Sequence, residues 1–218
     1  MRRFFMTSSS LHQVHSPPEA HVIVFLKAPR PGFVKTRLAA SLGDDRACRI
    51  YTQLVEGLLS RINTLTDVEL RFTPDDAIDE CSRWIQEGWL GIAQGDGGLG
   101  ERLARAFKEA FQRGADRVIA IGSDCPDVGE EEIREANRAL DDHSVVVGPA
   151  KDGGYWLIGM NAWYPVLFEG IDWSTDRVLA QTQSAARKMD LSIALLDTLE
   201  DIDDLESWQR FERRDSKN

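Results

Sequence analysis

The residues best suited to chemistry lie in a basic segment that follows a short apolar run. Its four cationic side chains are Lys27, Arg30, Lys35 and Arg37, and no Asp or Glu occurs from 21 to 43, although the chain has a net charge of −10. Lysine and arginine beyond a buried strand suit phosphate oxygens, because Arg can bind them bidentately and Lys acts as a point charge. The segment therefore predicts a phosphate-binding loop, with a solvated basic turn as the alternative.

Two further features of this segment fit a bound anion. Gly32 lets the backbone approach a ligand closely, because glycine has no Cβ. A helix that begins near Thr36 would point backbone amides toward the anion. The GxxxxGK[ST] spacing of a P-loop is absent here, so phosphate binding would follow another pattern.

A carboxylate follows a second apolar run. Asp124 ends a stretch that begins with Val118, which places it at the carboxyl edge of a predicted sheet. The Mg²⁺ or Mn²⁺ that accompanies a nucleoside diphosphate prefers carboxylate oxygens and would neutralise charge on the departing diphosphate. Alternatively, Asp124 or Asp127 caps the acidic helix that follows. We expect Asp124 to bind metal and Asp127 to cap the helix.

A third polar loop separates two apolar runs. Asp152, Gly153 and Gly154 form a strong turn signal that fits a plain hairpin. The carboxylate of Asp152 and the ring of Tyr155 could also contact a substrate, and the paired glycines would permit its close approach. We predict a substrate-binding role for this loop.

Other patterns point less clearly to chemistry. Residues 95–100 match GxGxxG, but Asp96 and Glu101 would repel a pyrophosphate, so we expect a loop before a helix and disfavour a dehydrogenase. The positions of the four histidines support no Ser-His-Asp or Cys-His set. The acidic segment at 197–204 could lend a second metal ligand, although a solvated helix start is the plainer interpretation.

The elements that must position these loops alternate along the chain. The continuous apolar, β-branched run at 22–26 predicts a strand buried on both faces, and further strands are expected at 68–72, 89–93, 118–121, 145–147, 155–160 and 191–196. Apolar residues at helical spacing predict helices at 46–62, 75–87, 100–112, 133–140, 175–188 and 205–211. This alternation predicts a three-layer α/β/α sandwich with a mainly parallel sheet, in which ligands bind beyond the carboxyl ends of the strands.

Length and composition set the wider frame. The 218 residues, 42% hydrophobic and 28% charged, predict one globular domain at 21–213, with a flexible leader at 1–20 and a tail at 214–218. The acidic net charge argues against a nucleic-acid partner. Three cysteines without a CxxC pair predict reduced thiols, and no apolar run reaches the roughly 18 residues of a membrane span. We expect a cytoplasmic protein.

Together the loops resemble a bacterial family of small glycosyltransferases with the GT-A, or nucleotide-diphospho-sugar transferase, fold. Some members are labelled arsenosugar biosynthesis glycosyltransferases. The matching blocks lie at 27–38, 122–126, 148–155 and 171–175, and the resemblance runs from about 21 to 210. It implies nucleotide-sugar binding at the first loop and a divalent metal at Asp124 in place of a full Asp-x-Asp triplet. The segment 35–38 also resembles a guanylyltransferase that builds the phospholactate part of a deazaflavin cofactor.

The sequence thus predicts a metal-dependent glycosyltransferase with a nucleoside-diphosphate sugar donor and a small-molecule acceptor. The expected ligands of the nucleotide phosphates are Lys27, Gly32, Lys35 and Arg37, and Asp124 is expected to bind Mg²⁺ or Mn²⁺. Asp152, as the candidate catalytic base, would face donor sugar or acceptor together with Gly153, Gly154 and Tyr155. The alternatives are nucleotidyl transfer from a nucleoside triphosphate and a non-catalytic nucleotide-binding protein.

Overall fold

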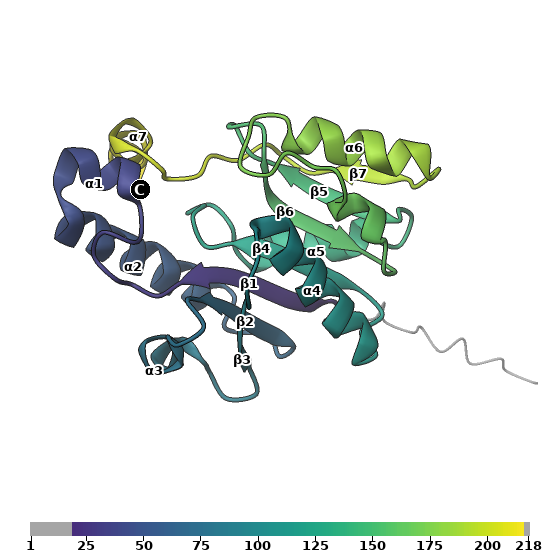
Figure 1. Cartoon of the computed structure of the whole chain (residues 1–218), viewed down its shortest axis with the longest axis horizontal. Helices are drawn as coiled ribbons and strands as arrows, with labels where there is room; N and C mark the ends of the chain where they lie inside the picture. The colour runs from purple at the N-terminus through teal and green to yellow at the C-terminus, as the bar shows by residue number, and fades with distance from the viewer. Residues whose placement is uncertain (1–18, 216–218) are drawn as a thin grey trace, which may run out of the picture.

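Within residues 19–215, which the computed structural model describes, seven strands form one sheet in the order β3-β2-β1-β4-β6-β5-β7 (Figure 1). The strands are β1 (His21–Lys27), β2 (Val68–Thr73), β3 (Leu90–Ala93), β4 (Val118–Gly122), β5 (Val145–Pro149), β6 (Tyr155–Met160) and β7 (Ile193–Leu195). Each expected strand is present. Most of the expected leader, at 1–18, and the last residues of the expected tail, at 216–218, lie outside the described residues.

The sheet is mainly parallel, as predicted. β1 pairs in parallel with β2 and β4, β2 with β3, and β5 with β7, whereas β6 runs antiparallel to both β4 and β5. Val24, near the middle of β1, pairs with Leu70 on one side and Ile121 on the other. β1 and β4 are apolar on both faces because helices cover both, whereas one face of β2 carries the buried charged residues Glu69 and Arg71.

The helices are α1 (Thr36–Leu42), α2 (Asp44–Arg61), α3 (Ile78–Cys81), α4 (Leu99–Gln112), α5 (Glu130–Ala139), α6 (Val178–Lys188) and α7 (Leu205–Asp215), with short 3₁₀ turns η1 (Ser82–Trp84) and η2 (Pro165–Phe168). Side chains of α2 and α5 pack with Val22 and Val24 on one face of the sheet. Side chains of α4 and α6 pack with Ile23 on the other face. The three-layer α/β/α sandwich is therefore confirmed.

One predicted helix is wrong in extent. The segment 75–87 forms only the short α3 and η1, and the chain becomes extended at Ile85. Trp84 and Trp89 are both buried in the core on the α2 side. Short helices depend on tertiary packing for most of their stability, and here the burial of two tryptophans replaces a continuous helix.

Two compositional expectations can be compared with the structure. Cys48, Cys81 and Cys125 are free thiols, and all three are buried. In the described part of the chain, no helix combines the length and the apolar character needed to cross a membrane.

Candidate active site

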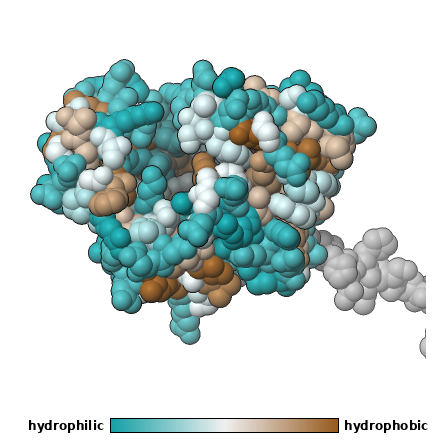
Figure 2. Space-filling view, in the orientation of Figure 1, coloured by the Kyte–Doolittle hydropathy of each residue, from teal (hydrophilic) through white to brown (hydrophobic). Residues whose placement is uncertain are grey.

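A cavity of about 490 Å³ lies beyond the carboxyl ends of β1, β2 and β4. In the space-filling view it corresponds to the hollow between the α1–α7 end and the rest of the molecule (Figure 2). Its walls include Lys35 from the loop after β1, Asp124 from the loop after β4, and Asp201 from the segment before α7. The cavity is where parallel α/β sheets bind ligands, because the loops from neighbouring strands converge there.

Lys35 is held rigidly at the start of α1. Its backbone is left-handed, with φ 50° and ψ 45°, which is uncommon for a residue other than glycine and recurs at functional sites. The side chain is only 3% exposed, and its Nζ lies 2.9 Å from Asp124 Oδ1 as an ion pair. The pair is not aligned as a hydrogen bond, and among the described residues no acceptor satisfies the buried ammonium. Its N–H donors are thus available to a ligand.

Asp124 faces the cavity and does not cap a helix. Its side chain is 44% exposed, and its backbone carbonyl accepts the N–H of Ile202 at 3.0 Å, which ties the segment before α7 to the site. At the start of α5, Gly129 N–H donates to Glu132 Oε2 instead. The expectation that Asp127 caps this helix is wrong, because its carboxylate pairs with Arg214 at 2.5 Å.

Asp201 is a second carboxylate of the cavity, in a segment that the sequence favoured as a solvated helix start. Burial raises the pKa of Asp201 from 3.8 to about 7, and the charge of Asp124 adds to this rise, while Lys35 opposes it. Asp201 thus lies in a partly desolvated position close to Asp124. The sequence contains a sign of this burial: the apolar Ile202, which is buried, interrupts the acidic segment at 197–204.

The other cations of the first loop divide between cavity and surface. Lys27 lines the cavity at the end of β1. Arg37 does not line the cavity: it is 79% exposed and pairs at 2.8 Å with Asp203, which does. Arg30 pairs with Glu80 and Asp76. Gly32 is exposed and has φ +80°, a left-handed conformation that explains why a glycine occupies this position. Phosphate binding by these residues stays a prediction.

Tyr51, which sequence reasoning did not select, anchors the end of β1. The Lys27 backbone N–H donates to Tyr51 Oη at 2.6 Å, and the hydroxyl donates to Lys27 O at 3.1 Å. Burial raises the pKa of Tyr51, so its hydroxyl stays protonated and able to donate. Helix α2 thereby fixes the strand end from which the basic loop leaves.

The third predicted loop is the turn of a hairpin between β5 and β6. Asp152 is exposed, accepts the Gly154 N–H at 2.9 Å and lies outside the cavity lining. Gly153 has φ +87°, and a Cβ at this position would lie 2.3 Å from Asp176 O. In the structure this glycine therefore permits a close approach to the backbone of Asp176. Tyr155 does line the cavity, and burial raises its pKa. Substrate contacts by Asp152, Gly153, Gly154 and Tyr155 stay predictions.

Metal-ligating groups are few in this region. Among residues 19–215, no group of three or more His, Cys, Asp or Glu side chains is arranged to hold a metal ion. The cavity offers the carboxylates of Asp124, Asp201 and Asp203, of which Asp203 pairs with Arg37.

Similarity to solved structures agrees with this geometry. The chain is 33% identical to the "putative nucleotide-diphospho-sugar transferase" of Desulfovibrio desulfuricans G20, with a TM-score of 0.85 over 90% of this chain and 87% of that one. A 4-diphosphocytidyl-2C-methyl-D-erythritol synthase from Anaerococcus prevotii is 10% identical, with a TM-score of 0.59 and 91% and 99% covered. A cytidylyltransferase from Leptospira borgpetersenii is 12% identical, with a TM-score of 0.58 and 92% and 88% covered. These last two show a shared fold alone, and no curated protein matches the chain.

The fold and the cavity at its strand ends define a transferase of the GT-A, nucleotide-diphospho-sugar transferase type, as the sequence predicts. The DUF2064 family, described as "Uncharacterized protein conserved in bacteria", matches residues 59–175. The chain belongs to this family, which the extensive similarity to the Desulfovibrio protein supports.

Proposed function

We propose that this protein transfers a glycosyl group from a nucleoside-diphosphate donor to a small-molecule acceptor, with Mg²⁺ or Mn²⁺ bound at Asp124. One observation carries the proposal. Nζ of Lys35, the predicted phosphate ligand, lies 2.9 Å from Oδ1 of Asp124, the predicted metal ligand, and both residues line one cavity. A diphosphate with its divalent ion needs a cationic and an anionic side chain side by side.

The donor set fits a divalent cation. Asp124 and Asp201 are neighbouring carboxylates, and among residues 19–215 only the ammonium of Lys35 pairs with Asp124. The raised pKa of Asp201 reflects its burial and the nearby negative charge of Asp124. We assign Asp124 and Asp201 as the two protein ligands. When bound, the metal would supply positive charge that offsets the charge developing on the departing diphosphate.

The chain's own residues would bind and orient the donor. Lys35, held by its left-handed backbone and its burial, presents an ammonium to phosphate oxygens without further reorganisation. Lys27 supplies a second cation from the end of β1. Arg37 could reach a phosphate only by leaving Asp203, so we rank it below the two lysines. Asp152 remains the candidate base, acting from the hairpin turn.

Nucleotidyl transfer is the second candidate. The fold is shared with cytidylyltransferases, and this likeness is a fold-level analogy. The two reactions differ in their released product: sugar transfer releases a nucleoside diphosphate, whereas nucleotidyl transfer from a triphosphate releases pyrophosphate.

A thermal-shift screen of nucleoside diphosphates, triphosphates and sugar nucleotides, with and without Mn²⁺, tests the proposal. Ligands that bind the native state raise the melting temperature. We expect sugar nucleotides to stabilise the protein only when Mn²⁺ is present, and the stabilising donor to release nucleoside diphosphate in the presence of acceptors. Pyrophosphate release would favour the second candidate. Failure of every nucleotide to stabilise the protein would contradict both.

A further inference from the structure

A second polar group lines the same cavity, at the ends of β2 and β3. Arg102, in the first turn of α4, extends toward Thr73 at the end of β2 and Gln94 just beyond β3. Its Nη1 lies 3.3 Å from Thr73 Oγ1 and 3.3 Å from Gln94 Oε1. Both acceptors are neutral, so they orient the guanidinium without offsetting its charge.

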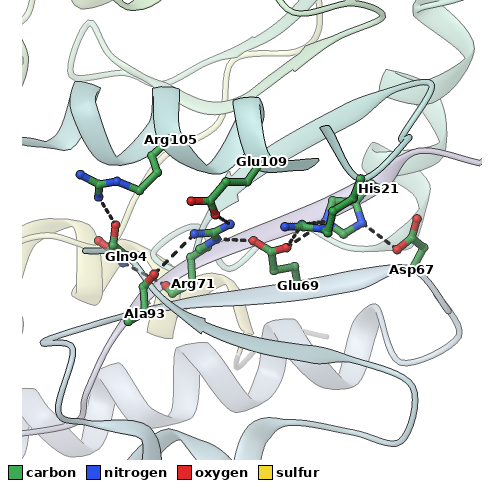
Figure 3. Close-up of polar contacts among 9 residues, drawn as sticks. His21, Asp67, Glu69, Arg71, Ala93, Gln94, Arg105 and Glu109 are labelled. Carbon is green, nitrogen blue, oxygen red and sulfur yellow. Dashed lines mark hydrogen bonds and ion pairs between the residues drawn. The ribbon is translucent and has the colours of Figure 1, made fainter. Parts of the chain in front are cut away.

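Gln94 is locked in place. Its side chain Nε2 donates to the backbone carbonyls of Leu26 and Arg71, each at 2.9 Å. Because both partners are acceptors, the amide nitrogen must point to them and Oε1 must face Arg102. The backbone carbonyl of Gln94 also accepts a hydrogen bond from Arg105 Nη1 at 2.5 Å, as Figure 3 shows. Gln94 therefore positions Arg102 rigidly.

Arg102 has no counter-charge within the described residues. It forms no ion pair there, in contrast to Arg71 nearby, whose guanidinium pairs with Glu69 and Glu109. The Arg102 Nε is buried and has no hydrogen-bond acceptor among residues 19–215. A guanidinium that faces a cavity with an unmatched charge and an unused donor favours an anionic ligand.

The place of Arg102 separates it from the proposed metal and diphosphate. Asp124 follows β4 and Thr73 ends β2, with β1 between them, so these positions are roughly 10 Å apart across the sheet. The Arg102 guanidinium is thus held at the ends of β2 and β3, away from the end of β4 that carries Asp124. Arg102 also lines an adjoining cavity of about 540 Å³, which shares Lys27, Phe33 and Thr73 with the first. Space for another part of the substrate is therefore present beside it.

We propose that Arg102 binds a second acidic group of the substrate, a carboxylate or phosphate separate from the phosphate at Lys35, with Gln94 as its positioning residue. The inference rests on the proposed function and narrows its substrate class. The acidic group belongs either to the acceptor or to a donor nucleotide with an additional phosphate. In both cases the guanidinium would bind it through charge-assisted hydrogen bonds.

Calorimetric titration of the full chain tests this with Arg102→Met and Arg102→Lys. Lys108→Met, on the exposed side of α4, is the matched control for loss of one positive charge. The first arm titrates UDP, CDP and GDP, and their triphosphates, with Mg²⁺. The second titrates inorganic phosphate into protein already saturated with the best diphosphate. We expect Arg102→Met to weaken binding about tenfold or more in one arm, and Arg102→Lys to weaken it less.

The arms separate the two sources of the acidic group. A loss confined to the phosphate arm assigns it to the acceptor, and a loss in the triphosphate titrations assigns it to the donor. Equal affinities of Arg102→Met and wild type in both arms overturn the inference, as does an equal loss in Lys108→Met. If wild type binds no nucleotide, the proposed function fails; if it binds nucleotide and Arg102→Met binds equally well, only this inference fails. Melting temperatures establish that each variant is folded.

Gln94→Met tests the positioning role. It removes the Oε1 acceptor of Arg102 without adding a charge to the cavity, so we expect it to weaken anion binding in the wild-type background. In the Arg102→Met background it should cause no further loss, because its effect acts through the guanidinium. A merely structural role of Gln94 would weaken binding in both backgrounds and would overturn this assignment.

Discussion

Two clusters of charged side chains in this protein differ in whether their charges are matched. One lies between α4 and the strands β1 and β2, and Figure 3 shows it. There Glu69, which is fully buried, pairs with Arg71, Arg113 and His21, and Arg71 also donates to Glu109 at 2.6 Å. We call these five residues the α4 network. Every one of them has a partner of opposite charge or a hydrogen bond to one.

The cavity cluster is arranged in the opposite way. Within the part of the chain that the structure describes, Lys35 has an ion pair but no aligned hydrogen bond, and Arg102 is held only by neutral acceptors. Asp201 has a raised pKa beside Asp124. Unmatched charge in a desolvated place costs stability unless a ligand supplies the missing partner. The charges of the α4 network are matched within the fold, whereas the charges of the cavity are those that we propose to bind substrate.

The largest effect should come from breaking the α4 network. Glu69→Ala would leave the buried guanidinium of Arg71 without its nearest carboxylate, and removing one partner of a buried pair costs about 3–5 kcal/mol. Urea unfolding would measure this loss in the free energy of unfolding. A loss below about 1 kcal/mol, the range of exposed pairs, would contradict a structural role.

Asp124→Asn tests the cavity cluster directly. We expect turnover of the donor to fall by more than about a hundredfold, in the range seen when one transition-state contact is removed, while the melting temperature changes little. Asp127→Asn is the matched control, because that carboxylate pairs with Arg214 outside the cavity lining. Equal turnover in the two variants would rule out the assigned role of Asp124.

Lys35→Met tests the cavity cluster by two measurements, nucleotide affinity and stability without ligand, of which only the first should fall. Nucleotide affinity should fall by roughly 1.5–3 kcal/mol, the contribution of a hydrogen bond to a charged group. Stability without ligand should stay equal or rise, because the variant removes the desolvation cost of a buried ammonium, and the partner that it leaves, Asp124, is 44% exposed to solvent. Parallel titration and urea unfolding would test both, and a marked loss of stability would assign Lys35 to the fold.

The smallest effect is a pH dependence of the α4 network. Burial lowers the pKa of His21, but hydrogen bonds to Glu69 and Asp67 outweigh it, and the pKa is raised above 6.5. The other charged group facing the ring is Arg113, whose Nη2 lies 3.5 Å from Nε2. The folded state thus holds a proton that the unfolded state releases near pH 6.5, so this stabilisation is complete below that pH and declines as pH rises through the raised pKa.

Comparison of wild type with His21→Gln isolates that contribution. The difference in free energy of unfolding should be greatest near pH 6 and should shrink toward pH 9. All other titrating groups, Asp201 among them, are common to both proteins and cancel in the difference. A difference that does not vary with pH would show that His21 is not protonated in the folded state.

The sequence by itself determined the elements and the main pair of the site. All seven strands were expected, β1 and β4 from continuous apolar runs, and the apolar spacing of 100–112 predicted α4, because both patterns are local consequences of burial. Lys35 and Asp124 could be brought together from sequence because each follows a buried strand, and parallel strands end at one edge of a sheet. The helix at 75–87 failed because the burial of Trp84 and Trp89 outweighed a weak local periodicity.

Only the tertiary structure decided which charges are open. Arg37 and Lys35 are cations two residues apart in the same basic segment. Asp203, from the far end of the chain, pairs with Arg37, whereas Lys35 lines the cavity beside Asp124. The pKa of Asp201 is likewise raised by its burial and by Asp124, which is distant in sequence. Arg102 has only neutral partners among the described residues. Coulombic and desolvation energies depend on distance and burial in space, and neither can be read from the order of residues along the chain.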